Sequence, residues 1–217
     1  MTNQELFSYV DHTLLKPEAT PEQIAVLCAE AAEHGTASVC VNGSYVPLAK
    51  KLLGGKAKVC AVIGFPLGAM STAAKAFEAA EAVRDGADEI DMVIHIGQLK
   101  AGNTDYVLED IKAVKAAIGD HVLKVIIETC LLTEEEKITM CRIVTESGAE
   151  YIKTSTGFST GGATFDDVRL FAEHVGEGVK IKAAGGIRSR EDMEQFLQLG
   201  ASRLGTSSAV KILCGKN

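Results

Sequence analysis

The chain has 217 residues, of which 47% are hydrophobic and 24% are charged, the balance of a globular protein with one good-sized core. Its net charge of -7 at pH 7 argues against nucleic acid as a general partner, although a local cationic pocket for an anion remains compatible with it. No apolar run is long enough to span a bilayer, and the first ten residues lack the pattern of a signal peptide.

Short β-type runs alternate with helical segments along the whole chain. After a short leading helix, we expect strands at residues 11–15, 37–41, 58–65, 88–94, 123–129, 151–155, 179–185 and 202–207. The helices are expected at residues 21–34, 44–53, 71–85, 105–118, 133–147, 164–174 and 189–199, with one more short helix at the end. Thr133 and Glu136 have the spacing of a capping box at the start of one of these helices.

A strict β-then-α order predicts a parallel sheet. Eight units of about 27 residues fit a compact (β/α)8 TIM barrel. We therefore expect one barrel domain over residues 1–217, with a short N-terminal helix before the first strand. A doubly wound open sheet is the alternative, but no Gly-rich dinucleotide loop follows an early strand.

An internal repeat predicts which strand residues face the barrel interior. Four helices end in a glycine followed by a small residue and then a strand, in the segments HGTASVC, DGADEID, SGAEYIK and LGASRLG. The sixth residue, counted from the glycine, lies on the second, fourth, sixth or eighth strand, and barrel layers draw on alternate strands. The expected inward layer is Cys40, Asp91, Lys153 and Gly205. Strand alternation turns their neighbours Ile90, Met92, Ile152 and Thr154 toward the helices.

Two lysines interrupt β-type runs, Lys153 in YIKTSTG and Lys182 in VKIKAAGG. Strands disfavour lysine, and burial of an ammonium group is costly. A free amine, however, condenses with an aldehyde or ketone to a Schiff base. An ordinary lysine is only roughly one part in 2,500 free amine at neutral pH.

We expect Lys182 to favour the free amine of Lys153, because a second ammonium group about 6 Å away contributes roughly 2.8 kcal/mol at an effective dielectric constant near 20. Asp91 is expected to hold Lys182 or a water molecule and to transfer protons. Two alternatives remain open at this point: lysines that reach solvent at the barrel rim, and a structural ion pair with the acid.

The turns after the last two strands predict a phosphate site. AAGGIRS and GTSSAV each lead directly into a helix, and barrels often bind phosphate with these two loops and a helix N-terminus. The candidate residues are Gly185, Gly186, Ser207 and Ser208. Taken singly, Gly-Gly and Ser-Ser are also ordinary turns and helix caps.

Metal-assisted chemistry is the competing interpretation. His12, His95 and Asp11 lie near strand ends, but no two histidines have the spacing of metal ligands. No two of the six cysteines lie within three residues of each other, which argues against a zinc motif or a CxxC pair. We expect small buried thiols in a reducing cytoplasm, with Cys40 packed in the pocket wall.

The motifs DHTLL, VIGFPLGA, EIDMVI, KVIIET, YIKTSTGF, IKAAGGIR and RLGTSS, in this order from about residue 10 to 210, resemble those of the deoxyribose-phosphate aldolases. These are Schiff-base (class I) aldolases on a TIM barrel. The resemblance implies reversible cleavage of 2-deoxy-D-ribose 5-phosphate to acetaldehyde and D-glyceraldehyde 3-phosphate, with no metal and no organic cofactor.

The resemblance also implies roles for individual residues. It carries the Schiff base onto Lys153, proton relay and control of the amine onto Lys182 and Asp91, and phosphate binding onto the two loops named above. Further substrate-binding candidates are Asp11, Thr13, Cys40, Thr156 and Gly157.

Two departures from the family pattern are visible. Some members have a phosphate-binding lysine where this chain has Phe158, so we expect backbone donors to hold the phosphate. Some members end in a tyrosine that takes part in proton transfer, whereas this sequence ends in KILCGKN, and we expect water in that role.

Other functions remain open from sequence alone. They are a phosphate-binding barrel lyase for another sugar and a non-catalytic sugar-phosphate sensor, although mere binding does not need a lysine pair. We expect sugar phosphates and aldehydes as ligands, no nucleic acid or membrane partner, and a cytoplasmic homo-oligomer (dimer or tetramer).

Overall fold

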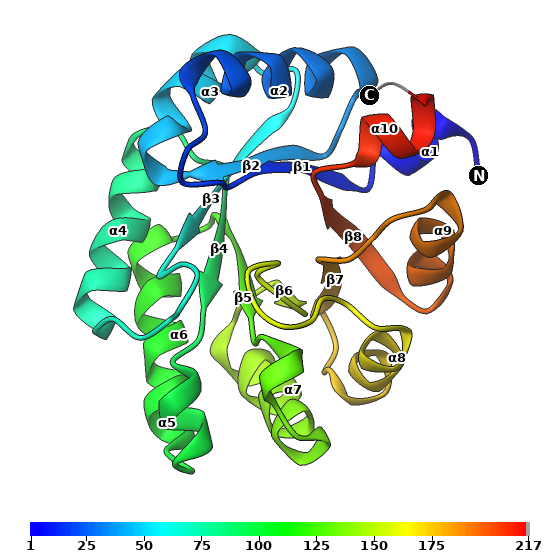
Figure 1. Cartoon of the computed structure of the whole chain (residues 1–217). Coiled ribbons are helices and arrows are strands. Elements are labelled where there is room, and N and C mark those ends of the chain that lie inside the picture. Colours follow the sequence, from blue (N-terminus) through cyan, green and yellow to red (C-terminus); the bar gives the residue numbers. More distant parts are fainter. Residues whose placement is uncertain (216–217) are drawn as a thin grey trace.

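The computed structural model describes residues 1–215 and forms a closed barrel of eight parallel strands surrounded by helices (Figure 1). The strands follow one another around the ring in chain order, and β8 pairs with β1 to close it. They are β1 (Val10–Leu14), β2 (Ser38–Asn42), β3 (Lys58–Ile63), β4 (Glu89–Val93), β5 (Val122–Ile126), β6 (Tyr151–Lys153), β7 (Lys180–Ala184) and β8 (Ala201–Thr206). The predicted (β/α)8 barrel is confirmed, and the open sheet is excluded.

The helices cover the outside of the ring. They are α1 (Asn3–Phe7), α2 (Pro21–His34), α3 (Val46–Leu53), α4 (Thr72–Arg84), α5 (Ile96–Lys100), α6 (Thr104–Ile118), α7 (Glu134–Ser147), α8 (Phe165–His174), α9 (Arg190–Gln198) and α10 (Ala209–Cys214). Single 3-10 turns lie at Gly43–Tyr45 and Thr129–Leu131. The predicted capping box of Thr133 and Glu136 starts α7. None of the helices within residues 1–215 is long and apolar enough to cross a membrane.

Three strands end two or three residues earlier than the sequence predicts. β3 ends at Ile63 and β5 at Ile126. β6 ends at Lys153. The next residue, Thr154, still donates its N–H to the Lys182 carbonyl, and its hydroxyl donates to the Ala184 carbonyl and accepts from the Ala184 N–H. Polar residues at these carboxyl ends therefore stand in loops above the ring rather than in the sheet.

One helix, α5, was not predicted. It spans only five residues and starts where the imidazole of His95 accepts a hydrogen bond from the Gln98 N–H. So short a segment offers too few residues for a helical period to be recognised.

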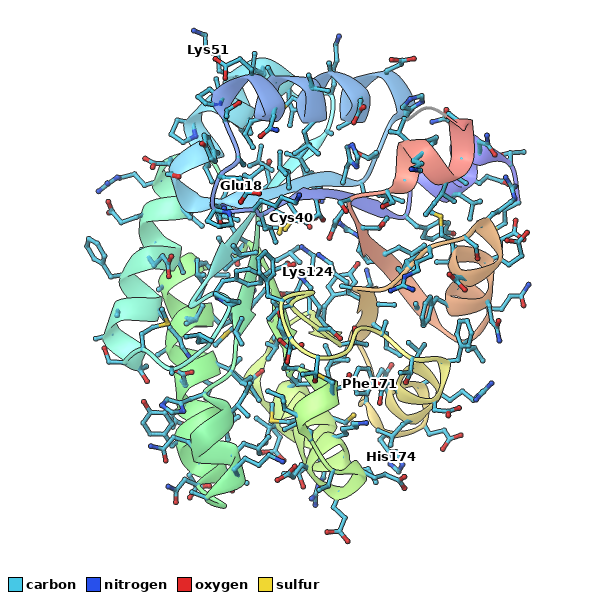
Figure 2. The ribbon with its side chains drawn as sticks, viewed as in Figure 1. Glu18, Cys40, Lys51, Lys124, Phe171 and His174 are labelled. Atoms are coloured by element: carbon cyan, nitrogen blue, oxygen red, sulfur yellow. The ribbon has the colours of Figure 1, made fainter. Side chains whose placement is uncertain are left out.

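The apolar core lies between the strands and the helices. Ile90, Met92 and Ile152 are fully buried in it, as the predicted alternation requires. The inside of the ring is different. Figure 2 shows Lys124 and Cys40 inside the ring, whereas Lys51 and His174 lie at the periphery. The barrel interior therefore holds polar groups that the apolar shell isolates from water.

Candidate active site

The barrel interior holds a cluster of charged side chains contributed by six of the eight strands. Partner residues on neighbouring parallel strands point to the same face, and this places Lys153 beside Lys182 and Asp91 beside Lys124. Every member is buried except Arg203, whose side chain is 12% exposed. The members are Asp11, Glu89, Asp91, Lys124, Lys153, Lys182 and Arg203.

Asp91 is the centre of this cluster. Its Oδ2 accepts hydrogen bonds from Lys153 Nζ at 2.7 Å and from Lys182 Nζ at 2.6 Å. The two lysine nitrogens are therefore no more than about 5.3 Å apart. Lys124 Nζ contacts the other oxygen, Oδ1, at 2.9 Å. The structure thus brings together the three residues singled out in the sequence, and it adds Lys124.

A second level of charges lies below Asp91. Asp11 pairs with Lys182 Nζ and accepts a hydrogen bond from Arg203 Nη1 at 2.7 Å. Glu89 pairs with Lys124 Nζ at 2.6 Å and with Arg203 Nη1 and Nη2 at 3.0 and 3.3 Å. Opposite charges therefore alternate from Asp91 down to Arg203. Charge-assisted hydrogen bonds of this kind compensate for the loss of hydration.

The contacts keep most members ionised. Burial by itself would raise the pKa of Asp91 and Asp11, but the neighbouring cations outweigh it and hold both carboxyl pKa values well below their usual range. Burial would lower the pKa of Lys124, Lys182 and Arg203, but the carboxylates outweigh it and raise all three. These three side chains therefore remain cations at neutral pH.

Lys153 is held less firmly than the other cations. Among the described residues it contacts one carboxylate, Asp91, and it shares that carboxylate with Lys124 and Lys182. Lys182 has a second carboxylate in Asp11, and Lys124 lies within 4.0 Å of three. Within the described structure, Lys153 is therefore the lysine of the cluster with the fewest carboxylate partners.

Lys153 is also the member of the cluster that reaches a cavity. This cavity of about 600 Å³ lies at the carboxyl ends of the strands and is lined by the loops after β1, β6, β7 and β8. These are the positions at which barrels place their active sites. The predicted residues on its wall are Thr13, Lys153, Thr156, Gly157, Gly185, Gly186, Ser207 and Ser208.

Two predicted wall residues lie elsewhere. Asp11 is fully buried below the cavity, where it holds Lys182 and Arg203, so the prediction that it lines the pocket is corrected. Cys40 is also fully buried and packs in a small apolar cluster with Leu15 and Val62 rather than on the cavity wall.

The loop after β6 packs directly on the turn after β7. A Cβ atom on Gly162 would lie 2.4 Å from the Gly185 carbonyl oxygen, so only glycine fits there. The next residue, Ala163, donates its N–H to the carbonyls of Ala184 and Gly185 at 3.1 and 3.0 Å. In the loop after β8, the Ser208 N–H already donates to Thr206 Oγ1 at 3.0 Å. Ser208 therefore offers the cavity its hydroxyl rather than its N–H.

Glu128 is a site residue that the sequence analysis missed. Its backbone has a φ of 56°, a left-handed conformation that is unfavourable for glutamate. The side chain is buried and accepts hydrogen bonds from the Thr156 N–H at 3.1 Å and from the Thr156 hydroxyl. This contact ties the end of β5 to the loop that forms one wall of the cavity.

The cavity mouth also carries two cations that were not predicted, Lys16 and Arg188. Both are exposed, and Arg188 follows the Gly185–Gly186 turn. Phe158, which stands where some family members have a lysine, is 49% exposed and packs edge-on against Phe65 at 5.2 Å. The positive charge near the predicted phosphate loops therefore comes from other positions.

The histidines of the metal alternative do not converge. His12 Nε2 contacts Glu30 of α2 at 2.7 Å, on the outside of the ring, and His95 caps α5.

A different trio, Cys40, Cys60 and Asp91, has potential ligand atoms within 4.8 Å of one another. Both oxygens of that carboxylate, however, contact lysine ammonium groups. Burial raises the pKa of the Cys60 thiol well above its usual range. Cationic neighbours and a protonated thiol disfavour a divalent metal ion at this position.

Comparison with known proteins agrees with this geometry. A family model described as DeoC/LacD family aldolase matches residues 6–217. The deoxyribose-phosphate aldolase of Clostridioides difficile (strain 630) is 56% identical over 210 residues, which cover 97% of this chain and 96% of that protein. The one from Streptococcus suis (strain 98HAH33) is 58% identical over 212 residues, which again cover 97% of this chain and 96% of that protein.

A solved structure agrees as well. The tetrameric deoxyribose phosphate aldolase from Aeropyrum pernix superposes with a TM-score of 0.88 at 33% identity, covering 99% of this chain and 92% of that chain. The chain belongs to the DeoC/LacD family of aldolases.

Proposed function

We propose that this protein reversibly cleaves 2-deoxy-D-ribose 5-phosphate to acetaldehyde and D-glyceraldehyde 3-phosphate through a Schiff base on Lys153. The observation that carries the proposal is the position of Lys153, whose amine lies at the floor of the cavity and shares Asp91 with Lys182. The deoxyribose-phosphate aldolases of similar sequence support the choice of substrate.

The reaction follows from the chemistry of a free amine. The Lys153 nitrogen attacks the substrate aldehyde carbon, C1, and loss of water leaves a protonated imine. Removal of the proton from the C3 hydroxyl breaks the C2–C3 bond, and the bonding electrons move into the imine to give an enamine. The glyceraldehyde phosphate leaves at this stage. Protonation of C2 and hydrolysis then release acetaldehyde and restore the amine.

Asp91 and Lys182 transfer the protons in these steps. The carboxylate contacts both nitrogens, so a proton can pass between Lys182 and the reacting centre without leaving the buried cluster. Since Lys182 does not line the cavity, we propose that a water molecule completes the path to the substrate.

The phosphate binds at the loops after β7 and β8, which line the same cavity as Lys153. Gly185, Gly186, Ser207 and Ser208 supply the donors, and the Arg188 guanidinium adds positive charge at the same wall. The part of the cavity wall formed by the loops after β7 and β8 thus suits an anionic substrate group. A non-catalytic sugar-phosphate sensor would need only these phosphate-binding residues. The buried pair of Lys153 and Lys182 is not needed for binding alone and therefore favours catalysis.

The direct test is release of acetaldehyde from 2-deoxyribose 5-phosphate in a coupled assay with a dehydrogenase. We expect equal rates with and without EDTA, and a kcat/KM at least about 10²-fold lower for unphosphorylated 2-deoxyribose, which lacks the anion. Absence of acetaldehyde release, or loss of the activity in EDTA, would contradict the proposal. Cleavage of a different sugar phosphate in parallel assays would favour the alternative lyase.

We also propose that the protein works as a homo-oligomer in the cytoplasm. The Aeropyrum pernix relative is described as tetrameric, and all six cysteines of this chain are free thiols, as a reducing compartment requires. Sedimentation equilibrium tests the first part, since a monomer at micromolar concentration would contradict it.

Glu128→Gln tests whether the strained residue positions the cavity wall. Glutamine keeps the shape of the side chain, but it replaces one of the two acceptor oxygens that hold Thr156 with a donor group. Loss of a buried hydrogen bond to a charged group costs about 1.5–3 kcal/mol, so we expect kcat/KM to fall by roughly 10- to 100-fold, mainly through a higher KM.

A Glu128→Gly variant is the matched control for backbone strain. Glycine relaxes the positive φ but removes the carboxylate, so it is expected to lose at least as much activity. If Glu128→Gly kept wild-type kinetics, Glu128 would have no positioning role.

A further inference from the structure

We propose that Glu89 and Arg203, at the lower level of the barrel interior, are positioning residues that set the pH range in which Lys153 acts as a free amine. Each contributes one charge to the buried cluster, and the net charge of the cluster determines how easily Lys153 loses its proton. Neither residue lines the cavity, and neither contacts Lys153 in the described structure. This inference rests on the proposed Schiff-base function and names two residues beyond it.

The first step is a count of charges. When every member is ionised, Asp11, Glu89 and Asp91 supply three negative charges, and the cluster cations supply four positive ones. The buried cluster then carries one uncompensated positive charge, which is costly away from water. Release of one proton makes the cluster neutral.

The second step decides which cation gives up that proton. The guanidinium of Arg203 does not deprotonate in proteins. Lys182 and Lys124 each contact more than one carboxylate, which holds their protons. Among the carboxylates of residues 1–215, Lys153 contacts that of Asp91 alone, so the surplus charge falls on the amine that faces the cavity. The cluster as a whole thereby favours the nucleophilic form of Lys153.

The third step links the lower level to the upper one. Glu89 contributes one of the three negative charges, and Arg203 one of the four positive charges. Arg203 bridges Glu89 and Asp11, and these carboxylates in turn contact Lys124 and Lys182. Because the interior is shielded from salt and water, a unit charge at this level still acts on the proton balance at Lys153.

Within residues 1–215, other titratable groups also face the cluster. Burial raises the pKa of the Cys60 thiol well above its usual range, so this thiol stays neutral. A hydrogen bond with Cys60 lowers the pKa of the Cys40 thiol, whereas burial and the Asp91 carboxylate act in the opposite direction. The Lys58 ammonium lies 3.5 Å from Glu89, but its side chain is 58% exposed and therefore screened by solvent. The remaining neighbours are the Tyr151 phenol, whose ring lies 5.5 Å from the Arg203 guanidinium, and exposed Lys180 beyond that ring.

The test is the pH dependence of kcat/KM, whose acid midpoint reports the cluster's proton release. Glu89→Gln removes a negative charge, which makes proton release easier, so the midpoint is expected to fall by about one pH unit. Arg203→Met removes a positive charge and is expected to raise the midpoint by about one pH unit. The double variant restores the surplus of one charge and is expected to return near the wild-type midpoint.

Asp88→Asn is the matched control. It changes the total charge by the same amount one residue away from Glu89, but Asp88 pairs with Lys50 and the Val59 N–H rather than with the cluster. Its midpoint should not move.

Midpoints that stay within about 0.3 pH units of wild type, or that move in the same direction in both single variants, would overturn the inference. Thermal melting identifies a variant that does not fold. If Arg203→Met does not fold, the midpoint of Glu89→Gln alone tests the inference, because glutamine fills the same volume as glutamate. Wild-type cleavage of 2-deoxyribose 5-phosphate is measured alongside, so failure of the inference is distinguished from failure of the proposed function.

Discussion

Lys153→Met is expected to lower kcat/KM for 2-deoxyribose 5-phosphate by at least about 10⁴-fold, because it removes the amine that forms the imine. Lys16 also lines the cavity, but it is exposed at the mouth and lies outside the buried cluster. Methionine keeps the apolar length of the side chain and adds no charge. Removal of the surplus positive charge leaves the rest of the cluster neutral, and we expect a melting temperature close to that of the wild type.

Borohydride reduction in the presence of acetaldehyde makes the same prediction visible by mass spectrometry. Wild-type protein is expected to gain one two-carbon adduct, on the peptide that contains Lys153, and Lys153→Met is expected to gain none there. Lys51→Met is the control, since this exposed lysine on α3 lies outside the ring (Figure 2). An adduct that stays on another lysine, together with retained activity, would contradict the assignment.

Lys182→Met is expected to lower kcat/KM by the second-largest factor and, unlike Lys153→Met, to shift its pH dependence. The two nitrogens are at most about 5.3 Å apart. At an effective dielectric constant near 20, the repulsion between two ammonium groups at this distance is about 3 kcal/mol, which corresponds to about two pH units. Without the second ammonium group the cluster is neutral while Lys153 still holds its proton. Proton release therefore becomes harder, and the acid midpoint of kcat/KM moves to higher pH.

Activity of Lys182→Met should accordingly fall by about 10²-fold near pH 7 and partly recover as the pH is raised toward about 9.5. The control is Lys180→Met, which removes an exposed lysine two residues earlier on β7 and should change kcat/KM less than about twofold. Full activity of Lys182→Met at neutral pH would refute the electrostatic role of Lys182.

The sequence was sufficient to predict the barrel and the inward positions of Asp91 and Lys153. Strict alternation of strands and helices leaves few topologies, and the repeat that ends four helices places Asp91 and Lys153 in equivalent inward positions. Gly205, from the same repeat, leaves room for a neighbour, since a Cβ atom there would lie 3.2 Å from the Lys182 side chain.

Two features of the sequence indicate the lower charged residues of the barrel interior. Glu89 stands two residues before Asp91, and residues two apart on a strand face the same side. Lys124 interrupts an apolar β-type run just as Lys153 does. What the sequence lacks is the pairing across the ring, because Arg203 reaches Asp11 and Glu89 only once the barrel has closed.

Glu128 could not have been identified from its residue type. A positive φ is expected of glycine, and nothing in the local sequence indicates that a glutamate adopts it. The tertiary contacts with Thr156 hold that conformation. The expectation that water takes the role of a tail tyrosine concerns the ending KILCGKN, of which residues 216–217 lie outside the described part of the structure.

The central claim is that Lys153 is a free amine near neutral pH because the buried cluster carries one surplus positive charge. The most direct measurement is the rate of imine formation between wild-type protein and acetaldehyde as a function of pH, followed by quenching with borohydride and quantifying the Lys153 peptide by mass spectrometry. We predict a half-maximal rate below about pH 8. A rate that rises only above about pH 10, as for an ordinary lysine, would contradict the claim.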